Sequence, residues 1–126
     1  MTTEENKQFI QRYFDAINGK PKPAAVLDLY TTDHDLKAHI QTAEEAFPLY
    51  RLDAEEIIAE GDLVSVRGWV RGVHRGPFGD IPPTGKPVEF SIFITYRIAA
   101  GKIVEHWMLT DNMAMMQQIG LLPNPA

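Results

Sequence analysis

The fold is decided by residues 88–109, which read VEFSIFITYRIAAGKIVEHWML. The first half of this stretch alternates without a break, so one face of an extended strand carries Val88, Phe90, Ile92, Ile94, Tyr96 and Ile98. Ala100-Gly101 is typical of a hairpin turn, after which residues 102–109 return as a second strand. The stretch therefore predicts a long antiparallel hairpin with one buried face.

Two further strands are expected before this hairpin. Residues 52–60 and 63–74 are strand candidates separated by the turn Glu60-Gly61-Asp62, and a Gly/Pro loop over 76–85 leads into the hairpin. Gly68 and Gly72 share a face of the longer strand with His74, and their missing side chains leave room for a neighbouring backbone or a ligand.

Helices are predicted on either side of these strands. Thr2 and Glu5 fit a capping box for a helix that ends at Asn18-Gly19, and a short helix is expected over 24–30. Asp35 is the expected cap of a third helix, and a last helix runs over 111–118. Helices followed by a strand meander predict an α+β domain, whose twisted sheet curls around the N-terminal helices and leaves a concave mouth for a ligand.

Composition narrows the class of protein. The 126 residues correspond to a single domain over 1–126, and the absence of cysteine excludes a disulfide scaffold or a thiol nucleophile. A net charge of −5 argues against nucleic acid as a partner. The apolar stretches are too short to cross a membrane, and the N-terminus is acidic and polar, unlike a signal peptide. We expect a cytoplasmic protein.

Several motifs, which together extend over much of the chain, resemble the SnoaL-like polyketide cyclase family of the nuclear transport factor 2-like superfamily. They are GVHRG at 72–76, IPPTG at 81–85, GKIVEHW at 101–107 and QQIGL at 117–121. The resemblance implies a cone-shaped, cystatin-like fold with a curved, mixed but mostly antiparallel sheet of six strands and three or four helices. It also implies frequent homodimers, no cofactor, and ring closure of a hydrophobic carbonyl compound by intramolecular aldol condensation.

One departure from the family pattern affects the chemistry. The family reads His-[Arg/Trp]-Asp-x-x-Asp where this chain has HWMLTD at 106–111, so Met108 replaces the proposed acid/base. An aldol closure needs a base for an acidic C–H and an acid for the developing alkoxide; a buried carboxyl group can serve both steps, but a thioether can serve neither. The retained Asp111 suits an N-cap better, because capping stabilises its ionised form.

The remaining proton carrier is His106. Strict alternation places it on one face with Val104 and Met108, and places Ile103 on the other. A neutral imidazole could act as a base there, while the alternative is a buried histidine satisfied by a partner. If the protein is catalytic, we expect His106 as proton carrier, with Asp111 as an orienting or secondary carboxylate.

Other residues are expected to shape the cavity. His74 either lines its mouth or fixes the Pro-rich loop, and the aromatic residues of the first helix either reach the pocket or belong to the core. The expected substrate-binding residues are Met108, His74, Ile92, Ile94, Tyr96, Tyr13 and Phe14.

Two functions therefore remain open. The first is a cofactor-free cyclase, and the second, favoured by Met108, is a non-catalytic protein of the same fold that binds a small molecule. An isomerase or epoxide hydrolase ranks below both, because those chemistries need pocket carboxylates. The four histidines lack the spacing of a zinc site, so no metal is expected. An outer sheet face carrying Trp69 and Phe93 predicts a homodimer.

Overall fold

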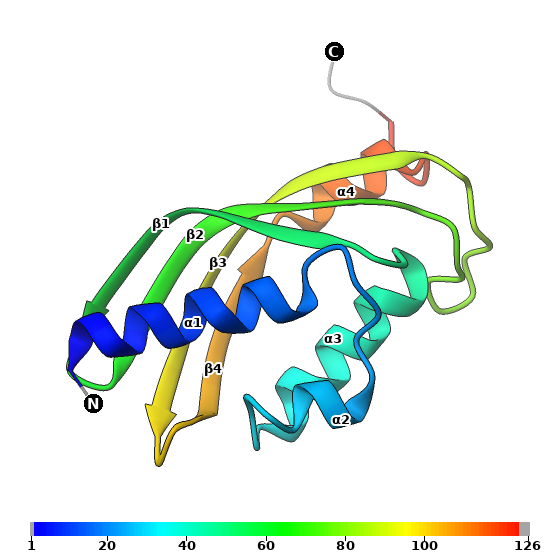
Figure 1. The fold of residues 1–126 in the computed structure, drawn as a ribbon. Helices are drawn as coiled ribbons and strands as arrows, with labels where there is room; N and C mark the ends of the chain where they lie inside the picture. Colours follow the sequence, from blue (N-terminus) through cyan, green and yellow to red (C-terminus); the bar gives the residue numbers. More distant parts are fainter. Residues whose placement is uncertain (1, 124–126) are drawn as a thin grey trace.

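The computed structural model describes residues 2–123 and has the expected α+β order (Figure 1). Four antiparallel strands lie in the order β1-β2-β3-β4. The elements along the chain are α1 (Thr3–Ile17), α2 (Ala24–Leu27), α3 (His34–Ala46), β1 (Arg51–Glu60), β2 (Leu63–Val73), β3 (Pro87–Ala99), β4 (Lys102–Thr110) and α4 (Asn112–Gln118). The predicted capping box of α1 is present at Thr2 and Glu5.

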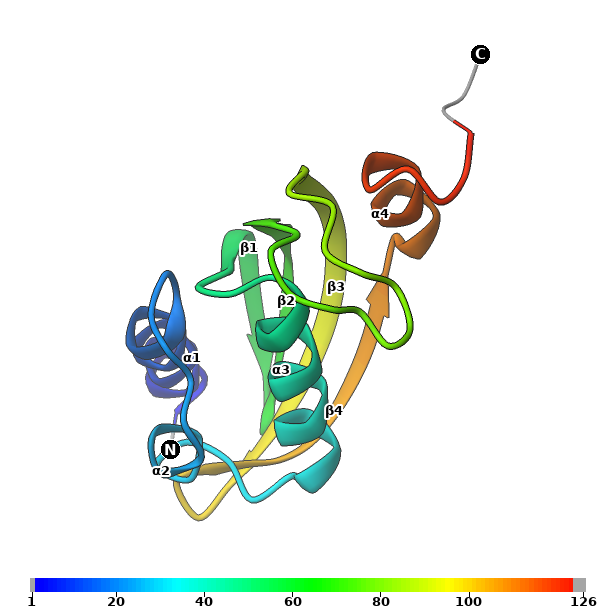
Figure 2. The ribbon, with the colours of Figure 1, turned by 90° about the vertical axis from the view of Figure 1, so that its right-hand side faces the viewer.

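The sheet curves over the helices, and its concave inner face receives α1 and α3 (Figures 1 and 2). Helix α1 packs against β1 and β2, whereas the N-terminal end of α3 meets β4. Apolar residues of the two helices and of the inner strand face form one buried core. The expectation of a sheet wrapped around the N-terminal helices is confirmed.

The register between β3 and β4 sets which side chains face inward. Tyr96 pairs with His106 and Ile94 with Met108, so all four lie on the inner face. The pairing then shifts, because Ile98 faces Ile103 and leaves Val104 as an extra residue. Ile103 is consequently buried on the inner face, and the expectation that it lies opposite His106 is wrong.

The segment between α2 and α3 also differs from expectation. Thr31 makes a single parallel bridge to Ile103, and its hydroxyl donates a hydrogen bond to the backbone carbonyl oxygen of Ile103 at 2.9 Å. Asp33 then caps α3 at once by accepting from the Leu36 N–H at 3.1 Å. The cap is therefore Asp33, not Asp35. The described residues contain four strands, all paired antiparallel, in place of the six-stranded mixed sheet that the resemblance implied.

Gly72 shows how the sheet accommodates the chain that crosses it. A Cβ at this position would lie 3.2 Å from the Cβ atoms of both Phe47 and Tyr50. The absent side chain therefore lets these two aromatic residues pack directly on β2.

Among residues 2–123, no helix is both long and apolar enough to span a bilayer.

Candidate functional site

A cavity of about 310 Å³ lies between the concave face of the sheet and helices α1 and α3. Most of its walls are apolar, with Leu36 and Ile40 from α3 facing Phe90 from β3. Among the side chains expected to contact a ligand, those that line it are Tyr13, Ile92, Ile94, Tyr96 and Met108. Met108 is 37% exposed at the edge strand, so it forms part of a wall open to solvent.

Three tyrosines supply phenol groups to this apolar cavity. Tyr13 comes from α1, Tyr50 directly precedes β1, and Tyr96 lies in β3. Burial raises the pKa of all three hydroxyls above the ordinary value; the proximity of the other two adds to the effect at Tyr13, whereas at Tyr96 the proximity of Tyr50 raises the pKa and the hydrogen bond with Tyr13 lowers it. The three groups therefore stay protonated at working pH and can donate hydrogen bonds.

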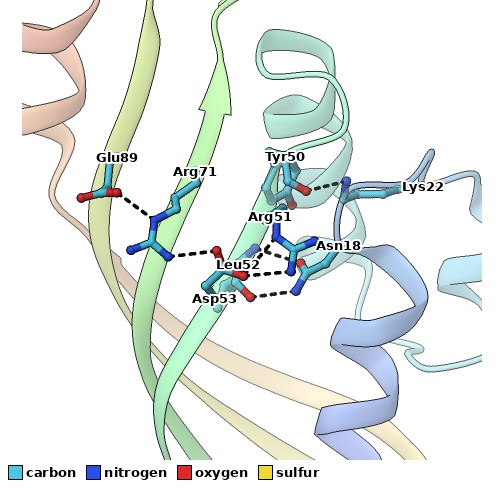
Figure 3. Close-up of polar contacts among 8 residues, drawn as sticks. All are labelled: Asn18, Lys22, Tyr50, Arg51, Leu52, Asp53, Arg71 and Glu89. Carbon is cyan, nitrogen blue, oxygen red and sulfur yellow. Dashed lines mark hydrogen bonds and ion pairs between the residues drawn. The ribbon is translucent and has the colours of Figure 1, made fainter.

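Tyr50 is held from the loop that follows α1 (Figure 3). Its backbone oxygen accepts from the Lys22 ammonium at 3.1 Å, and the same ammonium lies 4.2 Å from the centre of its ring. The side chain of Lys22 is fully buried and also pairs with Glu44 at 2.7 Å. The Asn18 side-chain amide binds both backbone groups of Leu52, which fixes the start of β1.

His106 lies on the inner face beside the N-terminus of α3. Its Nδ1 is 2.7 Å from Oδ2 of Asp33, and the two side chains are only 7% and 11% exposed. Burial acts to raise the pKa of Asp33, but hydrogen bonds from His106 and from the Leu36 N–H outweigh it and lower that pKa. Asp33 is therefore a carboxylate that can accept a proton from Nδ1, and in the neutral form of the imidazole that hydrogen bond would leave the lone pair on Nε2.

His39 connects this pair to the cavity. Its ring stands edge-on to that of His106, with the ring centres 5.4 Å apart, and His39 itself lines the cavity. His106 is not among the lining residues, but His39 and Tyr96, the strand partner of His106, are, so His106 lies at the edge of the site. The two imidazoles and Asp33 together form a polar corner that is able to carry a proton.

Asp111 lies away from this corner. Its carboxylate accepts from the Ala114 N–H at 3.0 Å and caps α4, which is the structural alternative considered from the sequence. The carboxylate that orients His106 is therefore Asp33, in place of the expected Asp111.

His74 and Phe14 also lie outside the cavity lining. His74 is fully buried, and its Nδ1 is 2.9 Å from the Thr84 hydroxyl and accepts from the Thr84 N–H at 3.3 Å. It thus fixes the Pro-rich loop, as the structural alternative held. Phe14 packs in the core against Tyr13 and Tyr96.

Three residues of the site were missed at the level of sequence. Tyr50 shares strand parity with the buried Leu52, which is a signal that could have found it. Asp33 stands three residues before Leu36, the usual spacing of a cap and the amide that it binds. His39 falls within the predicted third helix, and nothing local indicated its contact with His106.

The chemistry of the site is limited by what its walls contain. Apart from the tyrosines, His39 is the lining residue with an ionisable side chain, and none of the described residues that line the cavity is an aspartate or a glutamate. Within residues 2–123, no group of three or more His, Asp or Glu side chains is arranged to hold a metal ion. What the arrangement offers is neutral donors, one oriented imidazole and apolar walls.

The comparisons with known proteins agree with this architecture. AclR from Streptomyces galilaeus, described as a candidate hydroxylase, superposes with a TM-score of 0.85 at 25% identity, over 99% of this chain and 87% of AclR. IdmH from Streptomyces antibioticus, a candidate polyketide cyclase, gives 0.75 at 27% identity, over 92% of this chain and 99% of IdmH.

A third solved structure, a candidate SnoaL-like polyketide cyclase from Jannaschia sp. CCS1, gives a TM-score of 0.79 at 24% identity, over 96% of this chain and 95% of that one. No curated protein matches the chain in sequence. The family model described as SnoaL-like polyketide cyclase matches residues 10–119. The chain therefore belongs to the SnoaL-like polyketide cyclase family.

Proposed function

We propose that this protein binds a hydrophobic carbonyl compound in the inner cavity and closes a ring in it by cofactor-free acid/base chemistry. The observation that carries this proposal is the buried imidazole of His106, which Asp33 orients at the edge of an apolar cavity. Membership of the family supports a small-molecule ligand of this class.

In the proposed reaction, His106 Nε2 removes a proton from a carbon next to one carbonyl group of the ligand. The resulting enolate carbon forms a bond to a second carbonyl carbon of the same molecule, and that carbonyl oxygen takes the proton back from the imidazolium. Asp33 stabilises the imidazolium between the two transfers. His106 itself is not part of the cavity lining, so the proposal requires the reacting carbon to reach the corner between His39 and Met108, beside His106 on the same face of the sheet.

A second function, binding without turnover, is favoured by one observation. Met108 occupies the cavity wall where the family pattern has an aspartate, and the lining that residues 2–123 provide contains no carboxylate.

A fluorogenic diketone separates these functions. 2-Acetonylacetophenone closes to a fluorescent methylnaphthol with loss of water, so turnover is read directly. We expect the wild type to accelerate closure and His106→Ala to lower the rate about a hundredfold or more, because general acid/base catalysis contributes at least that much. His34→Ala removes an exposed histidine outside the cavity and serves as the control.

The outcomes differ for each function. Unchanged turnover in His106→Ala would contradict its role as the proton carrier. If the wild type binds the diketone without converting it, while Met108→Asp converts it, the chain is a binding protein whose catalytic carboxyl group has been lost.

We also propose that the protein is a homodimer joined through the outer face of the sheet. Four large apolar side chains are exposed there, namely Ile58, Phe93, Trp107 and Leu109, and they surround a shallow hollow of about 450 Å³. Exposed apolar surface of this kind is a usual mark of a protein contact. The family resemblance supports a second copy of the chain as the partner.

A further inference from the structure

Three of the four tyrosines in the chain line the same cavity. The fourth, Tyr30, packs against the rings of Phe9 and Tyr13, with ring centres 5.8 and 5.7 Å away, and is not part of the lining. Phenylalanine would serve an apolar wall equally well, whereas a buried hydroxyl costs free energy unless it finds a partner. The gathering of phenols therefore points to a polar group on the ligand.

The hydroxyls retain donors that a ligand can use. Tyr13 and Tyr96 interact through their phenol groups, and their rings meet edge-on with centres 5.9 Å apart. When one of these hydroxyls donates to the other, the proton of the second remains free. Among residues 2–123, no side-chain hydrogen bond contributes to the raised pKa of Tyr50, and its hydroxyl is not one of the fully buried polar atoms without a partner, which fits a group that faces the cavity. At least two O–H donors therefore remain.

These donors are held in place before any ligand arrives. Tyr50 is fixed by Lys22 and by the side-chain amide of Asn18, which binds both backbone groups of Leu52 two residues further along the chain (Figure 3). Tyr96 lies in a central strand, and Tyr13 is buried in the middle of α1. Preorganised donors in a water-poor site stabilise negative charge on oxygen, because they need no reorganisation when the charge appears.

We propose that the hydroxyls of Tyr13, Tyr50 and Tyr96 form a donor cluster that binds an ionised enol or phenol oxygen of the ligand. The ligand class is then an acidic 1,3-dicarbonyl compound or a phenol, which is narrower than a hydrophobic carbonyl compound. The inference rests on the proposed function, because it concerns the same cavity. During ring closure, the same donors would hold the enolate oxygen after His106 has taken the proton.

4-Nitrophenol tests this cluster, because its ionised and neutral forms absorb at different wavelengths. We expect the wild type to bind the ionised form about tenfold or more tighter than the neutral form, and therefore to lower the apparent pKa of bound nitrophenol. Each of Tyr13→Phe, Tyr50→Phe and Tyr96→Phe should reduce that preference about tenfold, as expected for hydrogen bonds to a charged group. Tyr30→Phe is the matched control and should keep it.

The results separate this inference from the proposed function. If the wild type and the three cavity variants all bind nitrophenol without preferring the ionised form to the neutral form, the donor cluster is refuted while the small-molecule cavity stands. No binding of either form by the wild type would overturn both. Preferred binding of the ionised form, without turnover of the diketone, supports the cluster and refutes the ring-closing reaction. Thermal unfolding of each variant verifies that it is folded.

Discussion

The two faces of the same sheet are both apolar, yet they differ in what they enclose. On the inner face, Ile92, Ile94 and Tyr96 border a cavity covered by helices. On the outer face, Phe93 is 53% and Leu109 is 73% exposed, with no helix over them in the described chain. Because neighbouring residues of one strand supply both surfaces, alternation alone distributes the two roles.

The difference in polar groups assigns a partner to each face. The inner face combines phenols and imidazoles with apolar walls, a set that orients a small molecule. The outer face carries ion pairs such as Arg67 with Glu55 and Arg97 with Glu105, and Arg97 also lies over the Trp107 ring. Exposed apolar side chains bordered by such pairs are typical of a protein interface.

The largest expected effect comes from breaking the polar corner of the inner face. In Asp33→Asn, the amide oxygen still caps α3, but the NH₂ group now donates to His106 Nδ1 and moves the imidazole proton to Nε2. We expect diketone turnover to fall about a hundredfold or more, because in this tautomer Nε2 carries the proton and can no longer act as the base. The melting temperature should stay close to that of the wild type.

Asp33→Ser controls for the helix cap, since serine also caps the helix but is too short to reach His106. It keeps the cap and removes only the contact with His106. Unchanged turnover in Asp33→Asn would show that the Asp33–His106 contact has no part in the chemistry.

A smaller effect is expected from the outer face. Leu109→Asp places a charge in the proposed dimer contact, so we expect at least about tenfold weaker association. Sedimentation velocity measures the association, and nitrophenol binding measures the cavity in the same samples. Weaker nitrophenol binding that follows dimer loss would contradict the independence of the two faces. Ile58 is also exposed on this face, and Ile58→Asp provides a second variant that should weaken association in the same way.

The smallest effect concerns acid stability. The pKa of Asp33 is lowered in the folded protein, so its contribution to stability is present above the unfolded pKa, near 4, and is lost as the pH falls through the lower folded value. Urea unfolding across this range should show a steeper acid loss in the wild type than in Asp33→Asn. Equal slopes would contradict the lowered pKa.

Local patterns predicted much of this molecule. The alternation over 88–98 identified the inner face of β3, and the spacing of Asp111 identified the cap of α4. Both features depend on residues close together in the chain, where steric and hydrogen-bonding preferences act directly.

Features that join distant segments could not be predicted in this way. Asp33 and His106 are 73 positions apart, and only the folded register brings them together. The extra residue at Val104 was hidden, because Ile103 and Val104 are both apolar and satisfy either alternation. The three tyrosines could not be grouped from the sequence either. They share a cavity only because α1 and the residue before β1 pack against the inner face of the sheet.

The central claim is that the inner cavity, and not the outer face, binds the small molecule. Isoleucine methyl NMR tests it directly, with 3-methyl-1-naphthol, one product of the diketone, as the titrant. We predict saturable shifts of the Ile40 and Ile92 methyl signals, which line the cavity, with Ile58 on the outer face unchanged. Shifts at Ile58, with Ile40 and Ile92 unmoved, would contradict the account.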